Sequence, residues 1–386
     1  MGQGARGQHI GRDLRSTSNA AADLKILQNP GLSNRGPLDG GCTAGLSGKT
    51  RARLRQVDIE WLRPLVFGVT RIVSLLPAAT EIIAALGLID HLVAVSHECD
   101  FPEAVKPLPR ATHCPIHNAG LTSQEVDAWV RRSLRENGTI YTINEPLLRS
   151  LRPEVILTQK LCDVCAVGYG TVARLAASLP GPPQVINLEP TSLPDIFADI
   201  QRVAEACGVP DRAREIVADL SARVDAIRDR AASIPYRPRC YLMEWVDPPF
   251  CSGHWGPELV EIAGGYDPLG RKHQPSAQIE WEEVLEADPD IIVLALCGYD
   301  TCSARRDYEH LRQYVGFESL RAVRNGDIYL VDASAYFARP GPRIVDSLEI
   351  LAGILHPDEF SEFTSNRSVI RMPIQDAESA AARSKN

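Results

Sequence analysis

The sequence predicts an α/β protein with two similar lobes, each with a parallel-rich sheet, joined by a long rigid helix and facing each other across a ligand cleft. Three observations support this prediction. The chain contains an internal β-α-β repeat, an amphipathic helix lies between the two copies, and unusual residues gather in the loops after the expected strands. A chain of 386 residues, 44% of them hydrophobic, is long enough for two cores.

The first half of each repeat is a strand, a proline-containing loop and a helix. Residues 71–76 (RIVSLL) are expected to form the first strand and residues 78–87 its helix. Residues 239–245 (RCYLMEW) and 256–265 follow the same order in the second copy. Glycine ends both expected helices, as is common at a helix C-terminus.

The second half of each repeat is a short helix, a corner of proline and an acidic residue, a β-branched strand and then a cysteine. Residues 147–162 and 282–297 both have this order. Both copies also place a carboxylate, Glu81 or Glu258, in the expected first turn of their first helix, where the helix dipole favours it. Two copies of one plan predict two similar lobes that face one another.

The connecting helix is expected over residues 213–231, where apolar residues recur at spacings of 3 and 4. At 1.5 Å per residue this helix is about 28 Å long, and it limits hinge motion between the lobes. The expected organisation is a mobile N-terminal extension (1–70), lobe 1 (71–190), connecting helices (191–236), lobe 2 (237–357) and a polar C-terminal tail (358–386).

Charge and hydropathy exclude several classes of partner. A net charge of -8 and a pI near 5.7 argue against nucleic acid or an anionic membrane as the main partner. The sequence has no apolar run of about 20 residues and no apolar signal core in its first seventy residues. The ten cysteines are expected to be free thiols in a reducing compartment. We therefore expect a cytoplasmic protein, or a periplasmic or cell-surface one if the true start lies elsewhere.

Two loops of the first lobe carry side chains that can bind metals. The segment SHECDFP (96–102) and the segment TQKLCDVC (158–165) supply imidazole, thiolate and carboxylate groups. Such groups are zinc or iron ligands, and the C-x-x-C pair is equally compatible with a redox couple or with one wall of a binding pocket. The candidate metal ligands are His97, Cys99, Cys162 and Cys165.

The second lobe contributes aromatic rings to the expected cleft. Its loops at 245–255, near 299 and at 335–342 are aromatic in a chain that is only 6% aromatic, and rings at strand ends suit a large flat ligand. With the loops of the first lobe, the candidate ligand-binding residues are Pro77, His97, Glu98, Cys99, Asp100, Gln159, Cys162, Cys165, Phe250, His254, Trp255, Tyr299, Tyr336, Phe337 and Arg339.

The chain lacks the usual catalytic sequence motifs. It has no Walker A motif, no G-x-G-x-x-G after a strand, no G-x-S-x-G and no H-E-x-x-H. The sequence therefore shows no resemblance to a nucleotide-binding or hydrolase site.

Taken together, these segments resemble the cobalamin-binding-protein branch of the helical-backbone family of solute-binding proteins for cobalamin and iron chelates. The resemblance covers roughly residues 71–357, and its matching stretches are RIVSLLPAATEIIAALGL (71–88), SHECDFP (96–102), LRPEVILTQKLCDVCAV (151–167), WGPELVEIAGG (255–265), WEEVLEADPDIIVLALCG (281–298) and RNGDIYLVDASAYFARPGPRIVDSLEILAGILHP (324–357). It implies non-covalent binding of a corrinoid between the lobes, with no catalytic residue, no enzymatic activity and no required cofactor. Where well-known cobalamin binders carry rings, this chain has Glu98 and Gln159.

The resemblance also implies partners and contacts. Exported members dock onto arginines of a membrane permease through one carboxylate on each lobe, and these positions match Glu145 and Glu282. Phe250, Tyr336 and Phe337 fall where relatives place rings against the ligand.

We therefore expect a monomer that binds a corrinoid or related metal chelate, as part of an ABC-type uptake system with a permease or as an intracellular relative. The alternative is a thiol-dependent redox or metal-binding protein that uses His97, Cys99, Cys162 and Cys165, with zinc or iron.

Overall fold

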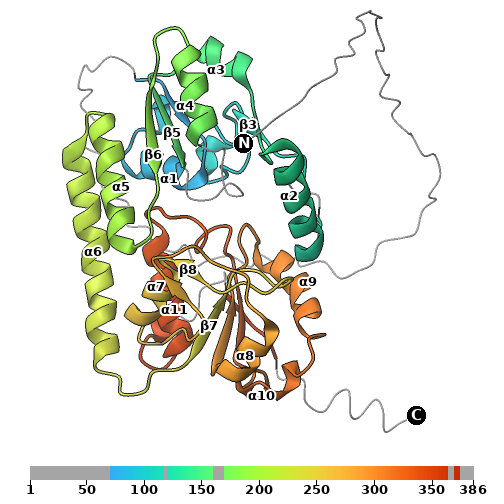
Figure 1. The fold of residues 1–386 in the computed structure, drawn as a ribbon. Helices are drawn as coiled ribbons and strands as arrows, with labels where there is room; N and C mark the ends of the chain where they lie inside the picture. Colours follow the sequence, from blue (N-terminus) through green and yellow to red (C-terminus); the bar gives the residue numbers. More distant parts are fainter. Residues whose placement is uncertain (1–69, 117–119, 160–168, 364–368, 374–386) are drawn as a thin grey trace, which may run out of the picture. The chain divides into compact units, whose positions relative to one another are not determined.

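The computed structural model describes residues 70–116, 120–159, 169–363 and 369–373, all within one compact unit that spans residues 56–386. Two lobes, each with a central sheet, make up this part of the chain (Figure 1). The predicted fold class is confirmed, because both sheets are parallel or largely parallel and carry helices. The expected N-terminal extension lies outside the described residues, except for Thr70.

Lobe 1 contains a four-stranded parallel sheet in the order β2-β1-β5-β6. Its strands are β1 (Ile72–Ser74), β2 (Leu92–Val95), β5 (Val155–Gln159) and β6 (Gln184–Leu188). Its helices are α1 (Pro77–Ala85), α2 (Ser123–Asn137), α3 (Glu145–Leu151) and α4 (Tyr169–Ser178). The short antiparallel strands β3 (Thr112–His113) and β4 (Thr142–Ile143) lie on either side of α2 in the sequence.

Lobe 2 contains a second four-stranded sheet in the order β12-β11-β10-β7. Its strands are β7 (Cys240–Met243), β10 (Ile291–Leu294), β11 (Ile328–Val331) and the antiparallel β12 (Val369–Arg371), with a separate small pair β8 (Gly253–His254) and β9 (Arg271–Lys272). Its helices are α7 (Gly256–Ile262), α8 (Trp281–Ala287), α9 (Thr301–Leu311), α10 (Arg321–Asn325) and α11 (Ile344–Leu355). The sheet therefore includes residues from the range 358–386 that we expected to be a polar tail.

The internal repeat appears in the strand order. The neighbours β1-β5-β6 of lobe 1 correspond to β7-β10-β11 of lobe 2, and all are parallel. One detail of the prediction is wrong: α1 begins at Pro77, so Glu81 is the fifth helical residue and not in the first turn. Proline is favoured at the first helical position because it has no N–H to leave unpaired, which explains the earlier start. Glu258 lies in the first turn of α7, as expected.

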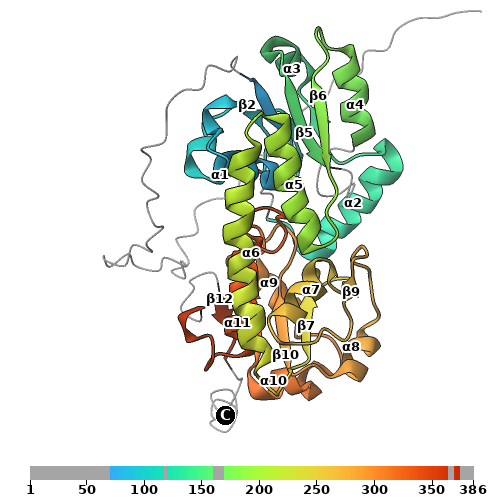
Figure 2. The ribbon, with the colours of Figure 1, turned by 90° about the vertical axis from the view of Figure 1, so that its left-hand side faces the viewer.

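The connecting helix runs alongside both lobes. It is α6 (Pro210–Ala232), preceded by α5 (Leu193–Ala206), and Figures 1 and 2 show it beside both sheets. Its buried side chains at Leu220, Val224 and Ile227 belong to one apolar cluster that also includes α1 of lobe 1 and α11 of lobe 2. Because this cluster crosses from lobe to lobe, the α6 side of the molecule is a packed contact rather than a loose hinge. None of the described helices is long and apolar enough to cross a membrane.

Candidate functional site

The loops that follow the parallel strands bring the two lobes into contact. The Arg339 guanidinium, in the segment between β11 and α11, donates from Nη1 to Asp100 Oδ1 at 2.6 Å and to Glu81 Oε1 at 3.1 Å. Asp100 belongs to the SHECDFP loop after β2, and Glu81 belongs to α1. Two of the predicted site residues, Asp100 and Arg339, therefore meet across the lobes.

Glu81 is the centre of this contact, and it was not among the predicted site residues. Its side chain is buried, 3% exposed, and it also accepts two hydrogen bonds from Arg343, from Nε at 2.9 Å and from Nη2 at 2.6 Å. Burial opposes the charge of Arg339, but Asp100 and Glu81 outweigh it and raise the pKa of the guanidinium. We call Glu81, Asp100, Arg339 and Arg343 the inter-lobe ion cluster.

The backbone approaches closely beside this cluster. A Cβ atom on Gly341 would lie 3.2 Å from the carbonyl oxygen of Ala78 in α1. Glycine therefore allows the Arg-Pro-Gly-Pro-Arg segment (339–343) to lie against the first turn of α1, which places both arginines next to Glu81. A charged residue within the otherwise apolar helix 78–86 was the available sequence signal for a buried ion pair.

An exposed aromatic ring lies at the edge of the inter-lobe ion cluster. Phe101 is 43% exposed, and the Arg343 guanidinium carbon lies 3.9 Å from its ring centroid. The same guanidinium lies 5.4 Å from the ring centroid of Tyr336, a predicted ligand contact of lobe 2. Arg343 thus contacts one ring from each lobe. Phe101 is a candidate ligand contact that was not among the predicted site residues.

The other predicted rings of lobe 2 are differently placed. Trp255 and Phe337 are only 8% and 6% exposed, and the indole Nε1 of Trp255 donates to the carbonyl of Phe337 at 3.1 Å. His254 packs 5.6 Å from the Trp255 ring, and burial lowers its pKa. Phe250 is half-buried and its backbone bridges to Trp245. Trp255 and Phe337 therefore contribute to the core and leave little ring surface for a ligand.

The three side chains of the His-Glu-Cys segment differ in burial: Cys99 lies in the core, whereas His97 and Glu98 are partly exposed. Cys99 is buried, with its Sγ 3.1 Å from the Thr80 hydroxyl and 3.2 Å from the Ser96 hydroxyl, and burial raises its pKa. A buried thiol with a raised pKa stays protonated, which makes it a poor metal ligand. His97 Nδ1 lies 2.8 Å from the Thr112 hydroxyl.

Glu98 lies between His97 and the inter-lobe ion cluster in its charge interactions. Burial raises its pKa, Arg339 opposes that shift and Asp100 adds to it. One carboxylate oxygen lies 3.6 Å from His97 Nε2. A carboxyl with a raised pKa keeps its proton at higher pH and can donate a hydrogen bond to a neutral acceptor.

The candidate metal set cannot be assembled from the described part of the chain. Cys162 and Cys165 lie outside the described residues, and among those described no three His, Cys, Asp or Glu side chains are placed to hold a metal ion. Gln159, the last residue of β5, is buried, and Pro77 is half-buried at the start of α1. The metal site therefore stays a prediction.

A second inter-lobe contact lies at α2, on the other side of the lobes from α6 (Figure 1). The backbone N–H of Ser123 donates to Asp307 Oδ1 in α9 at 3.4 Å, and the Tyr299 hydroxyl donates to the carbonyl of Leu121 at 3.4 Å. Ser123 and Asp307 are each 1% exposed. Tyr299, a predicted ligand contact, therefore takes part in a contact between the lobes.

The two predicted docking carboxylates occupy equivalent places in the repeat. Glu145 lies in the first turn of α3 and Glu282 in the first turn of α8, and both are exposed. Both helices end at a residue with positive φ just before a proline, Arg152 and Asp288. The docking role of both carboxylates stays a prediction.

Two similar lobes, one long helix beside both, and charged and aromatic loops that meet at strand ends define a ligand-carrying binding protein. The chain belongs to the periplasmic binding protein family, whose model matches residues 72–335. This match confirms the predicted resemblance to solute-binding proteins. Members of this family are non-catalytic ligand carriers, so the protein is not an enzyme.

Individual relatives agree with this family. The vitamin B12-binding protein of Vibrio cholerae is 26% identical over 293 residues, covering 73% of this chain and 88% of the relative. The vitamin B12-binding protein of Yersinia pestis is 27% identical over 233 residues, covering 58% and 69%. These relatives carry their compound as a ligand, in agreement with the expectation of no required cofactor.

Solved structures confirm the fold. A periplasmic heme-binding protein of Pseudomonas aeruginosa superposes with a TM-score of 0.57 at 20% identity, covering 75% of this chain and 93% of that one. The periplasmic vitamin B12-binding protein of Vibrio cholerae superposes with a TM-score of 0.53 at 21% identity, covering 77% and 98%.

The expectation of a cytoplasmic protein is wrong. The matching family and the solved relatives are periplasmic binding proteins. The lack of a recognisable apolar core in residues 1–70 does not decide the compartment. The comparisons also give no support to the alternative of a thiol-dependent redox or metal-binding protein.

Proposed function

We propose that the protein binds a corrinoid of the cobalamin type between its lobes, as the substrate-binding component of an ABC-type uptake system. The observation that carries this proposal is the similarity over 293 residues to a vitamin B12-binding protein, of which this chain covers 88%. The matched 73% of this chain is longer than either lobe, so the similarity extends over residues of both.

The charges between the lobes favour a corrinoid over heme. Heme carries two propionate groups, whereas the side chains around a corrin ring are mostly neutral amides. Arg339 and Arg343 are already paired with Glu81 and Asp100, and Glu98 adds another carboxyl beside them. A dianionic ligand would compete with these carboxylates for the same guanidinium groups, whereas a neutral amide would not.

The polar and aromatic groups beside the ion cluster also suit a corrinoid. Phe101 offers an exposed ring backed by Arg343, and Tyr336 lies on the opposite lobe. Glu98 adds a carboxyl group that can accept a hydrogen bond from the N–H of an amide. Flat apolar area with a few fixed polar groups is the usual composition of a small-molecule site.

The permease partner is inferred from the repeat. Glu145 and Glu282 are exposed at the start of equivalent helices, one on each lobe, so two arginine-bearing sites on a permease could pair with them. Each exposed ion pair contributes little binding free energy alone. Two pairs formed together fix the orientation of the protein on the permease.

A pair of matched variants tests the location of the ligand. Phe101→Ala removes a 43% exposed ring beside the ion cluster, and Tyr266→Ala removes a 53% exposed ring after α7. We expect hydroxocobalamin to bind Phe101→Ala about 10-fold more weakly and Tyr266→Ala with unchanged affinity, since a stacked ring contributes roughly 1 kcal/mol or more. Equal affinities for the two variants would contradict the proposed location.

A further inference from the structure

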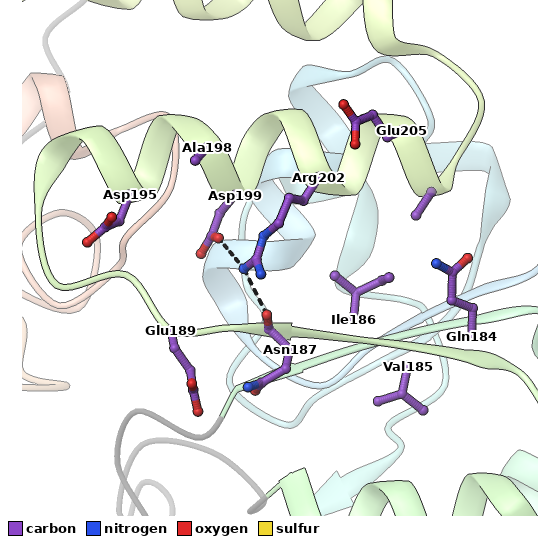
Figure 3. Close-up of a pocket in the computed structure, with 11 residues that line it drawn as sticks. Gln184, Val185, Ile186, Asn187, Glu189, Asp195, Ala198, Asp199, Arg202 and Glu205 are labelled. Atoms are coloured by element: carbon purple, nitrogen blue, oxygen red, sulfur yellow. Dashed lines mark hydrogen bonds and ion pairs between the residues drawn. The ribbon is translucent and has the colours of Figure 1, made fainter.

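An acidic groove lies along the edge strand β6 of the lobe 1 sheet. It has a volume of about 890 Å³ and runs between β6 and α5, lined by residues 184–187 and 189 on one side and by six α5 residues on the other (Figure 3). Nothing in the proposed corrinoid site uses this groove.

The backbone of β6 offers hydrogen-bonding groups to the groove. In the described sheet β6 is an edge strand paired with β5 alone, and the Gln184 N–H donates to Glu154 O at 2.9 Å. Because backbone groups alternate in direction along a parallel pair, those of Val185 and Asn187 point away from β5. An edge with unpaired backbone groups is a template for a further strand.

One of these outward groups already has a cationic partner. Arg202 of α5 donates from Nη2 to the carbonyl of Asn187 at 2.8 Å, and it also pairs with Asp199 (Figure 3). One outward carbonyl of β6 therefore already accepts a hydrogen bond from a positively charged donor, which an added strand would displace.

The groove also has a surplus of acceptors. Glu189, Asp195, Asp199 and Glu205 line it, with Arg202 as the single cation among its lining residues. Asp199 is 3% exposed, and within the described part of the chain its Oδ2 atom and the Oδ1 atom of Asn187 are buried without a hydrogen-bond partner. An unpaired buried acceptor costs roughly 1–3 kcal/mol, so these two oxygens show that the lining of the groove has fewer hydrogen-bond donors than acceptors.

We propose that the groove between β6 and α5 binds an extended segment of a partner protein that carries lysine or arginine side chains and adds to the edge of β6. The strand β6 has five residues, so the added segment would match about 17 Å of chain. A second copy of this chain does not fit, because it would bring the same carboxylates face to face.

Labelled synthetic peptides test this proposal by fluorescence anisotropy at low ionic strength. The probe is Lys-Val-Lys-Val-Lys, which we expect to bind with a Kd of about 100 µM or tighter. Its counterpart with glutamate in place of lysine is expected not to bind. A third peptide, N-methylated at alternate residues, keeps the charge but loses backbone donors, and we expect it to bind at least about 10-fold more weakly.

Variants locate the binding in the groove. Asp199→Asn and Glu189→Gln each remove a lining carboxylate, and we expect each to weaken binding of the lysine peptide several-fold. Glu215→Gln, an exposed residue of α6 outside the groove, is the matched control and should leave binding unchanged.

Three results would overturn the proposal: no binding of the lysine peptide up to about 1 mM, an equal loss in the Glu215→Gln control, or equal binding of the N-methylated peptide. Spermidine is added at the same concentration of positive charge as the lysine peptide. If it displaces the peptide completely, the groove binds amines without regard to the backbone, which would contradict strand addition. Because hydroxocobalamin is absent from all these experiments, their outcome is independent of the proposed function.

Discussion

Replacing Glu81 with glutamine removes the negative charge at the centre of the inter-lobe ion cluster. Glu81 is 3% exposed and accepts hydrogen bonds from two guanidinium groups, at 3.1, 2.9 and 2.6 Å. A glutamine amide would keep one acceptor oxygen but would turn its NH2 group toward the guanidinium N–H groups. It would also leave Arg343 without a carboxylate partner. Arg339 would retain Asp100, whose side chain is 56% exposed.

The size of the effect follows from burial. Removing one partner of a buried ion pair costs about 3–5 kcal/mol, because the other charge stays buried and uncompensated. We expect about 3 kcal/mol, at the lower end, because Asp100 still pairs with Arg339 and the Phe101 and Tyr336 rings still contact Arg343. For a unit of this size the midpoint of thermal unfolding should fall by about 6 °C.

Urea unfolding followed by circular dichroism measures the difference, with Glu154→Gln as the matched control. Glu154 also pairs with an arginine, Arg71, but its side chain is 47% exposed, so its loss should cost below about 1 kcal/mol. If Glu81→Gln destabilises the protein no more than Glu154→Gln does, the ion cluster does not hold the lobes together and this reasoning is refuted.

Two further predictions concern other parts of the molecule. Burial raises the pKa of Asp199 from 3.8 to about 6, so the folded state holds its proton more tightly than the unfolded state and stability should fall as pH rises from about 4 to 6. Asp199→Asn should flatten this part of the pH profile of urea unfolding by up to about 3 kcal/mol, and an unchanged slope would contradict the shift. Asp307→Asn should weaken the contact between α9 and the N-terminus of α2 and speed hydrogen exchange across α2, whereas Asp300→Asn, which keeps a good helix cap, should not. Equal exchange in the two variants would mean that Asp307 does not hold α2 against lobe 2.

The repeat and the connecting helix could be predicted because their signals are local and periodic. The strands β1 and β7 and the helix α6 are each specified by a continuous apolar pattern, and tertiary packing agrees with that pattern. The strand β12 was missed because it is short and because Arg371 separates the apolar residues Val369 and Ile370 from the buried Met372.

The inter-lobe contacts could not be predicted because their partners are far apart in the sequence. Glu81 and Arg343 are separated by 262 positions, and Ser123 and Asp307 by 184. No periodic pattern links such residues, so only the folded arrangement of the two lobes brings them together. The same holds for Cys99: its neighbours in the sequence suggested a metal ligand, but Thr80 and the core surround it.

The most direct test of the proposed function is a calorimetric titration of the full chain with hydroxocobalamin, repeated with hemin. We expect one corrinoid to bind per chain with a Kd of about 1 µM or tighter, and hemin to bind at least about 10-fold more weakly, because Arg339 and Arg343 are already paired. No heat of binding with hydroxocobalamin up to about 100 µM, or tighter binding of hemin, would contradict it.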